Sequence, residues 1–403
     1  MKTVALVGTF DSKGKEYLYL KELMEKAGLS VLTIHCGVFE PTFTPDVSNA
    51  EVAKAAGAEI TQLAEKKDRG HATETLSKGI EKLLPKLYAD GRFDGVFALG
   101  GSGGTSIVTP GMRALPVGVP KIMVSTVASS DVSSIVGTSD IIMVPSVVDV
   151  AGLNSISAKI FTNAAFAMVG MLTNESVSSL EKKPIIATTM FGVTTPCVNA
   201  AREYLEAKGY EVLTFHATGT GGRCMEDLVR AGFINGVLDI TTTEWCDELF
   251  GGVFAAGPHR SEAAGQCGVP QVVSVGAMDM VNFNAFDTVP EQFRGRNLYK
   301  HNPNVTLMRT TVEENRLLGE KLAEKLNMTK SKTALFLPLQ GVSMIDATGQ
   351  PFYGKEEDAA LFAALRKNVD ASKVEVVEMD LPVNSPEFAR AMADKLLEYM
   401  KTL

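Results

Sequence analysis

Residues 4–35 read VALVGTFDSKGKEYLYLKELMEKAGLSVLTIH, and residues 185–216 read IIATTMFGVTTPCVNAAREYLEAKGYEVLTFH. Both stretches begin with a short apolar run, continue with apolar residues at helical spacing, and close on a second β-rich run that ends in histidine. Matching landmarks lie 181 residues apart, as Phe10 and Phe191 do, or His35 and His216. A β-loop-α-β unit that occurs twice predicts two domains of like topology.

The correspondence continues beyond the first unit of each copy. FDGV at 93–96 is matched by INGV at 234–237, and GVP at 118–120 is matched at 268–270. Strands that alternate with helices imply right-handed crossovers and parallel pairing. We therefore predict an α/β protein of two tandem Rossmann-like, doubly wound domains with mainly parallel sheets. Their expected ranges are 1–180 and 185–403, separated by a charged linker that ends in proline.

Composition restricts the class of protein. With 403 residues, of which 45% are hydrophobic and 21% charged, the chain has the composition of a globular protein large enough for two cores. A net charge of −8 argues against binding nucleic acid through phosphate contacts. No apolar run approaches a membrane-spanning length, so we expect no membrane partner. Five scattered cysteines without a signal-like start indicate a cytoplasmic protein with reduced thiols, and no histidine spacing indicates a metal site.

Two segments have no counterpart in the other copy. Phe39–Arg69 is polar and shows a helical pattern from Ala50 to Lys67, so we predict an insertion that covers one side of the first domain's cleft. In the second domain, Phe283–Asn304 is predicted to be a loop that leads into a strand at Val305–Met308.

The two copies differ most after the third strand, where the first has GGSGGT at 100–105 and the second has TTTEW at 241–245. Doubly wound folds bind ligands at the carboxyl ends of their strands. Amides without side chains at a helix start can converge on an anion, which favours phosphate binding here. The alternative is a tight turn that needs glycine only for its conformation. The motif is neither a Walker loop, nor a dinucleotide fingerprint, nor a hydrolase elbow.

The loop GTFDSKG at 8–14 ends the first strand on the same sheet edge. Its hydroxyls and Lys13 would hold phosphate oxygens, and Asp11 would hold Mg²⁺ or a ribose hydroxyl. The alternative is a helix cap beside a solvated lysine. With two hydroxyl residues after the fourth strand as pocket wall, the predicted nucleotide-binding set is Thr9, Phe10, Asp11, Ser12, Lys13, Gly100, Gly101, Ser102, Gly103, Gly104, Thr105, Ser125 and Thr126.

Polar residues on loops of the second domain form a second candidate group. Glu244, His259, Arg260 and His301 lie near predicted strand ends, and together they would supply an acid/base pair and an anion clamp. The alternative is that the histidines are surface or capping residues. The two strand-end histidines that the copies share are interpreted as architectural.

Four motifs together resemble a known family. VGTFDSKG at 7–14, LGGSGGT at 99–105, GPHR at 257–260 and LPLQGVS at 337–343 are similar to the UPF0261 family, the Tm-1-like group of ATP-binding proteins. The similarity covers essentially the whole chain. The resemblance implies two Rossmann-like subdomains, ATP bound by the N-terminal one, and a homodimer.

These observations lead to one expected function with two alternatives. The leading expectation is an ATP-binding protein that holds the nucleotide in its N-terminal domain. If it is an enzyme, Mg²⁺-dependent phosphoryl or nucleotidyl transfer involving a small anionic metabolite would suit the site. The first alternative is a non-catalytic regulatory or interaction module that responds to nucleotide. The second is an enzyme for a phosphorylated or carboxylated metabolite that does not use ATP.

Overall fold

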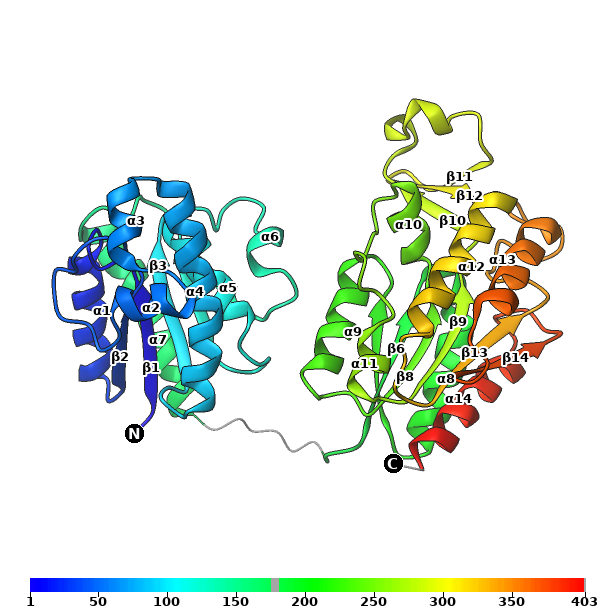
Figure 1. Cartoon of the computed structure of the whole chain (residues 1–403), viewed down its shortest axis with the longest axis horizontal. Coiled ribbons are helices and arrows are strands. Elements are labelled where there is room, and N and C mark those ends of the chain that lie inside the picture. Colours follow the sequence, from blue (N-terminus) through cyan, green and yellow to red (C-terminus); the bar gives the residue numbers. More distant parts are fainter. Residues whose placement is uncertain (175–180, 402–403) are drawn as a thin grey trace. The chain divides into compact units, whose positions relative to one another are not determined.

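The computed structural model of the chain describes residues 1–174 and 181–401. It divides into two compact units, Met1–Ser179 (unit 1) and Leu180–Leu403 (unit 2). Each unit has a parallel sheet with helices on both faces (Figure 1). The predicted fold class, two Rossmann-like domains with mainly parallel sheets, is confirmed.

Unit 1 has a five-stranded sheet in the order β2-β1-β3-β4-β5, all neighbours parallel. Its strands are β1 (Thr3–Gly8), β2 (Ser30–His35), β3 (Gly95–Gly100), β4 (Lys121–Ser125) and β5 (Ile142–Pro145). Its helices are α1 (Gly14–Lys26), α2 (Asn49–Ala55), α3 (Ile60–Lys66), α4 (Arg69–Ala89), α5 (Ser102–Arg113), α6 (Ser133–Val136) and α7 (Ser155–Thr173). The strand order reverses between β1 and β3, which is where such folds open a crevice.

Alternation along the strands places a core on each face of this sheet. Val4 and Leu6 of β1 pack under α1 and α7, whereas Ala5 and Val7 pack under α2, α4 and α5. Because both faces are covered, the strands are apolar throughout rather than alternately polar.

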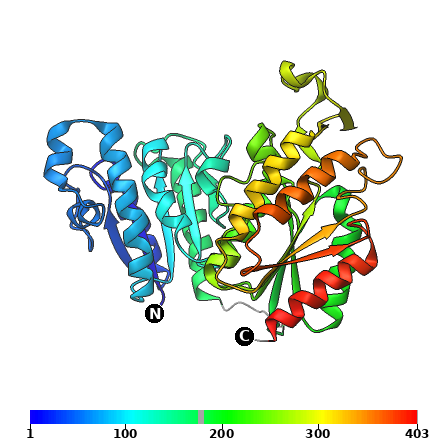
Figure 2. The ribbon, with the colours of Figure 1, turned by 45° about the vertical axis from the view of Figure 1, so that its right-hand side comes forward.

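Unit 2 repeats this plan with one more parallel strand, in the order β14-β13-β9-β8-β6-β7. Its strands are β6 (Ile185–Met190), β7 (Glu211–His216), β8 (Gly236–Thr241), β9 (Gln271–Gly276), β10 (Met280–Phe283), β11 (Leu298–Asn302), β12 (Val305–Arg309), β13 (Thr333–Pro338) and β14 (Val374–Met379). Its helices are α8 (Thr195–Ala207), α9 (Thr220–Arg230), α10 (Glu244–Phe250), α11 (Ala263–Cys267), α12 (Val312–Leu326), α13 (Lys355–Asn368) and α14 (Pro386–Met400), with short 3₁₀ turns η1 (Gly192–Thr194), η2 (Phe286–Thr288) and η3 (Glu291–Phe293). Helices α12 and α13 lie side by side over the sheet (Figure 2).

Two local predictions were wrong. The segment 283–304 is not only a loop, because β11 lies in it and pairs with β12, which also pairs with β10 to complete a three-stranded antiparallel sheet. The insertion is not one helix from Ala50 to Lys67. It breaks into α2 and α3 at Gly57, whose φ of +78° favours glycine and ends the first helix.

Helix α7 corrects the expectation that no segment reaches membrane-spanning length, because its 19 residues are long and apolar enough to do so. One side of this helix belongs to the core of unit 1, where Phe161, Ala165 and Met168 are buried against the sheet. Its apolar composition is explained by that packing, although Ile156 and Phe166 on the same helix are exposed.

The landmark pairs of the repeat form the same contact in both units. The Phe10 ring stacks on the His35 ring at 5.4 Å, and the Phe191 ring stacks on the His216 ring at 5.5 Å. His35 is also fully buried, and its Nδ1 accepts a hydrogen bond from the Phe10 amide at 3.1 Å. The architectural interpretation of His35 therefore fits its surroundings.

The hydroxyl of Tyr17 separates β1 from β3 at the crevice. Pairing of the two strands ends at Val7 and Ala98. Beyond that point the Tyr17 hydroxyl accepts from the Leu99 amide at 2.9 Å and lies 2.8 Å from the Val7 carbonyl oxygen, which it can donate to. A Cβ on Gly8 would stand 1.9 Å from this hydroxyl, so glycine is required there.

Replacing Tyr17 with Phe is expected to lower the free energy of unfolding of unit 1 by about 2 kcal/mol, because buried backbone groups lose their partner. Tyr19→Phe is the matched control. It removes a half-buried hydroxyl that bonds only Thr162 and should cost about 0.5 kcal/mol. Urea unfolding followed by circular dichroism measures both, with the fluorescence of Trp245, the only tryptophan, identifying the transition of unit 2. Equal stability of the two variants would contradict the role given to Tyr17.

Candidate functional site

A pocket of about 670 Å³ opens at the crevice of unit 1. Its lining comes from the loops after β1, β2 and β3, from the insertion, and from one residue before α7. The lining residues are Thr9, Asp11, Ser12, Lys13, Gly37, Val38, Phe39, Leu63, Ala64, Lys67, Asp68, Arg69, Ala72, Thr73, Gly100, Gly101, Ser102, Gly103, Gly104, Ile107 and Asp149. Nine of the thirteen residues of the predicted nucleotide-binding set are among them.

The glycine loop forms the floor of this pocket. Gly100 ends β3, and α5 begins at Ser102 without a side-chain cap, its first backbone bond running from the Thr105 amide to the Gly101 carbonyl. Consequently the amides of Ser102, Gly103 and Gly104 have no acceptor within the helix. They stand at the positive end of a 12-residue helix dipole.

The glycines of this loop are not required by backbone conformation. None of the four has a positive φ. At Gly101, Gly103 and Gly104 a Cβ would meet its nearest neighbour at 3.4 Å or more, which is ordinary contact. A tight turn that needs glycine therefore does not explain the run, and the remaining effect of the missing side chains is to leave the amides accessible.

Asp11 is the most constrained polar residue of the first loop. Its Oδ2 accepts from the Phe39 amide at 3.1 Å, while Oδ1 is buried with no partner among the described residues. Its carboxylate lies against Gly37, where a Cβ would come within 2.5 Å. The alternative of a helix cap is wrong, because the N-cap of α1 is Lys13 and no side chain caps it.

Four residues of the predicted set do not line the pocket. Phe10 is buried in the core, where it stacks on His35 and Phe43. Thr105 and Ser125 are buried behind the glycine loop, and their hydroxyls bond each other at 2.7 Å. Thr126 lies beside the loop, its hydroxyl 3.7 Å from a Cβ built on Gly101. Phe10, Thr105 and Ser125 therefore support the pocket wall, because their side chains are engaged in packing or in hydrogen bonds.

Sequence patterns missed the basic residues of the insertion. Lys67 and Arg69 reach the pocket rim beside Lys13, and none of the three forms an ion pair within residues 1–174 and 181–401. A guanidinium nitrogen of Arg69 lies 3.4 Å from a Cβ built on Gly103. The sequence indicated only that the insertion exists. It did not show that the end of the insertion lies beside the glycine loop, because the two segments are far apart along the chain.

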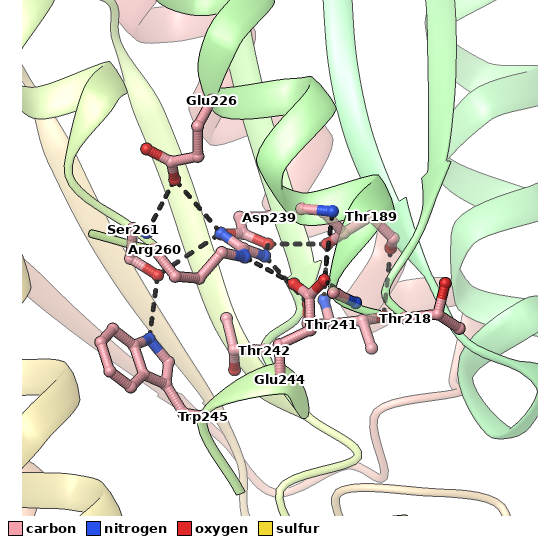
Figure 3. Close-up of polar contacts among 12 residues, drawn as sticks. Thr189, Thr218, Glu226, Asp239, Thr241, Thr242, Glu244, Trp245, Arg260 and Ser261 are labelled. Atoms are coloured by element: carbon pink, nitrogen blue, oxygen red, sulfur yellow. Dashed lines mark hydrogen bonds and ion pairs between the residues drawn. The ribbon is translucent and has the colours of Figure 1, made fainter. Parts of the chain in front are cut away.

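In unit 2, Arg260 and Glu244 form a buried ion pair (Figure 3). The Arg260 guanidinium bonds both oxygens of Asp239 at 2.6 and 2.7 Å and Glu244 Oε2 at 2.6 Å, and it lies 3.5 Å from Glu226. Its side chain is 1% exposed. Burial raises the pKa of the Glu244 and Glu226 carboxyls, and Arg260 opposes part of that rise. Together with Glu226 and Asp239, the pair therefore connects α9, β8 and α10 inside the unit.

The two histidines of this second candidate group lie at the surface. The side chain of His259 is 76% exposed, and its Nδ1 lies 3.1 Å from Glu262. His301 is exposed on β11, where its ring contacts Tyr299. Neither histidine is within the contacts of the Arg260 cluster, so the structure does not assemble the proposed acid/base group.

A second buried charge cluster in unit 2 brings together Asp279, Arg309 and Asp346, which lie near predicted strand ends in the sequence, with Asp358. Arg309 bonds Asp358 at 2.9 Å and Asp346 at 3.2 Å, and Asp279 lies nearby, bonded to Ser343 at 2.7 Å. Burial, together with the neighbouring carboxylates, raises the pKa of Asp346 to about 9, and burial raises that of Asp279 to about 6. These groups join the antiparallel sheet to the loop after β13 and to α13.

Fold and pocket define a class of two-domain α/β protein in which one domain carries a glycine-loop pocket at its switch point. The chain belongs to the uncharacterised protein family UPF0261, whose N-terminal domain matches residues 2–177 and whose C-terminal domain matches residues 183–400. The resemblance seen in the four motifs is thereby confirmed.

Relatives match across both domains. A UPF0261 protein of Clostridium tetani is 54% identical over 99% of both chains, and one of Rhizobium meliloti is 47% identical over 97% of both. The ToMV resistance protein Tm-1(GCR237) of Solanum lycopersicum is 41% identical over 98% of this chain and 55% of its own length. The plant protein therefore contains a large region that this chain does not match.

Arg260→Lys is expected to lower the free energy of unfolding of unit 2 by about 3 kcal/mol, although charge is kept. An ammonium cannot bond Asp239 through two nitrogens and still reach Glu244. Urea unfolding followed by Trp245 fluorescence measures the change. Arg230→Lys is the control, because that arginine is 39% exposed and its contacts are 3.3 Å or longer. An Arg260→Lys protein with unchanged stability would rule out a structural role for the cluster.

The Asp346 cluster predicts that unit 2 loses stability as pH rises from the acid range toward 9. A carboxyl whose pKa is raised by folding contributes its full stability below the unfolded value and loses it as pH rises toward 9. Between pH 7 and 9 the free energy of unfolding should fall by up to about 1.4 kcal/mol per pH unit. Asp346→Asn should flatten this slope, whereas the exposed control Asp287→Asn should leave it unchanged. Identical slopes in the three proteins would refute the assignment.

Proposed function

We propose that unit 1 binds ATP, with the phosphates on the amides of Ser102, Gly103 and Gly104. The observation that carries this proposal is a glycine run without positive φ that starts a helix and lines a pocket at the switch point. Helix N-termini with accessible amides attract anions through both hydrogen bonds and the dipole. The family resemblance to Tm-1-like ATP-binding proteins selects ATP among nucleotides.

The charges around the floor suit a polyphosphate. Lys13, Lys67 and Arg69 approach from two different loops, and their free ammonium and guanidinium groups would neutralise several phosphate oxygens. Asp11 fits a divalent cation, because its buried Oδ1 lacks a partner while its carboxylate is held in place by the Phe39 amide. Mg²⁺ usually takes one or two carboxylates together with phosphate oxygens and water.

Part of the pocket lining is apolar. Val38 and Phe39 from the loop after β2, Leu63 and Ala64 of α3, and Ile107 of α5 are among the lining residues. A volume of about 670 Å³ lies within the range of small-molecule sites. A nucleotide combines the two properties that this pocket offers, a charged chain and a flat apolar ring.

The lining also bears on the choice between an enzyme and a binding module. The carboxylates among the lining residues are Asp11, Asp68 and Asp149, and Asp68 already caps α4 through the His71 amide. Because Asp11 is assigned to the cation, Asp149 is the candidate base if phosphoryl transfer occurs. ATP turnover, measured with and without small carboxylate or phosphate metabolites, separates a Mg²⁺-dependent enzyme from a module that binds without hydrolysis.

Isothermal titration calorimetry with Mg-ATP tests the proposal. Affinity should decrease from ATP to ADP, AMP and adenosine, because each phosphate removed gives up contacts to the loop. Arg69→Ala should weaken ATP binding about tenfold through the loss of one charge-assisted contact. The control is Arg92→Ala, which removes an exposed arginine that does not line the pocket. No titration signal with any of these ligands, or equal binding by the two variants, would refute the site.

A further inference from the structure

Gly103 and Glu244 occupy the same position in the two units. Each is the third residue after its strand, β3 or β8, and each of those strands lies beside the first strand of its unit. The register agrees at the other end of these strands. There the Asp94 amide bonds the Thr3 carbonyl at 2.7 Å, and the Asn235 amide bonds the Ile185 carbonyl at 2.8 Å.

In both units this position faces the first turn of the preceding helix. A Cβ on Gly103 would stand 3.4 Å from the guanidinium of Arg69, the first residue of α4. The Glu244 carboxylate reaches the first turn of α9, where its Oε1 accepts from the Gly219 amide at 2.7 Å and the Gly222 amide at 3.1 Å. The space that is open in unit 1 thus corresponds to space filled by a carboxylate in unit 2.

The contacts of Glu244 are those of a bound anion. Two backbone amides at the start of an 11-residue helix hold one oxygen, and the Arg260 Nε holds the other at 2.6 Å (Figure 3). The side chain is not exposed at all. A Cβ on Gly222 would come within 2.3 Å of Oε2, so the helix needs glycine there to admit the carboxylate.

We propose that unit 2 retains an anion site of which Glu244 is the permanent occupant, and that Gly103 keeps the equivalent place open in unit 1. The occupancy of unit 2 stands on its own contacts, whereas the comparison with unit 1 rests on the proposed function. Without the Glu244 side chain, the amides of Gly219 and Gly222 and the Arg260 guanidinium form a site for a small carboxylate such as formate or acetate.

Glu244→Ala tests the proposal through chemical rescue. In chloride buffer the variant should unfold about 10 °C below the parent protein, because a buried guanidinium loses a partner. Sodium formate at the same ionic strength should raise the unfolding temperature in proportion to the logarithm of its concentration, as a ligand of the native state does. The fluorescence of Trp245, the adjacent residue, reports the transition of this unit.

Glu244→Gln is the matched control, because its amide fills the same space and leaves no room for formate. Formate should stabilise neither this variant nor the parent protein beyond the effect of chloride. If Glu244→Ala is insoluble, its refolding yield in formate against chloride replaces the unfolding temperature. Equal response of Glu244→Ala to the two salts, or equal response of the Gln variant to formate, would overturn the proposal.

The reciprocal change in unit 1 is Gly103→Glu, with Gly170→Glu as its control, because Gly170 lies in α7, does not line the pocket, and has open space around its Cβ position. Gly103→Glu should abolish ATP binding while the unit stays folded, and Gly170→Glu should retain the affinity of the parent protein. If the parent protein binds no nucleotide, the proposed function fails. The formate experiment on unit 2 still decides whether the anion site exists.

Discussion

The pocket of unit 1 depends on one hydroxyl group. Two neighbouring strands of a parallel sheet can diverge only where other groups satisfy the backbone donors and acceptors that their separation exposes. Tyr17 does this by accepting from the Leu99 amide beside the Val7 carbonyl, and Gly8 leaves room for its ring. The loops after β1 and β3 begin beyond this point, so their polar groups surround a cavity instead of continuing the sheet.

In unit 2, side chains of the strands themselves bond the backbone groups that the separation of the first and third strands exposes. The Thr189 hydroxyl accepts from the Thr241 amide at 2.9 Å and donates to Asp239 at 2.7 Å, and Asp239 in turn binds Arg260 (Figure 3). Arg260 then holds Glu244 against α9. The crevice is closed by a continuous polar network, which explains why Glu244 and Arg260, two of the predicted catalytic residues, are buried.

Much of the fold could be predicted because the same alternation of strand and helix patterns occurs twice in the sequence. The parallel strand pattern follows directly from periodicity and glycine positions, whereas the contact of Phe10 and of Phe191 with histidine is known only from the structure. The direction of individual side chains could not be predicted. Phe10 turns into the core because its neighbours His35 and Phe43 form an aromatic cluster there. Arg69 lies against Gly103 although the two residues are far apart in the sequence. The burial of Arg260 could not be predicted either, because the same polar sequence motif is compatible with a loop at the surface and with one in the interior.

The closed network of unit 2 also implies that the stability of the two units responds differently to small molecules in a cell. A domain whose crevice is filled by its own ion-paired side chains has no room there for a small molecule that would add to its stability. A domain with an open pocket becomes more resistant to unfolding as its ligand accumulates, by simple mass action. Turnover by proteases would then follow the ligand supply through unit 1, while unit 2 would remain indifferent to it.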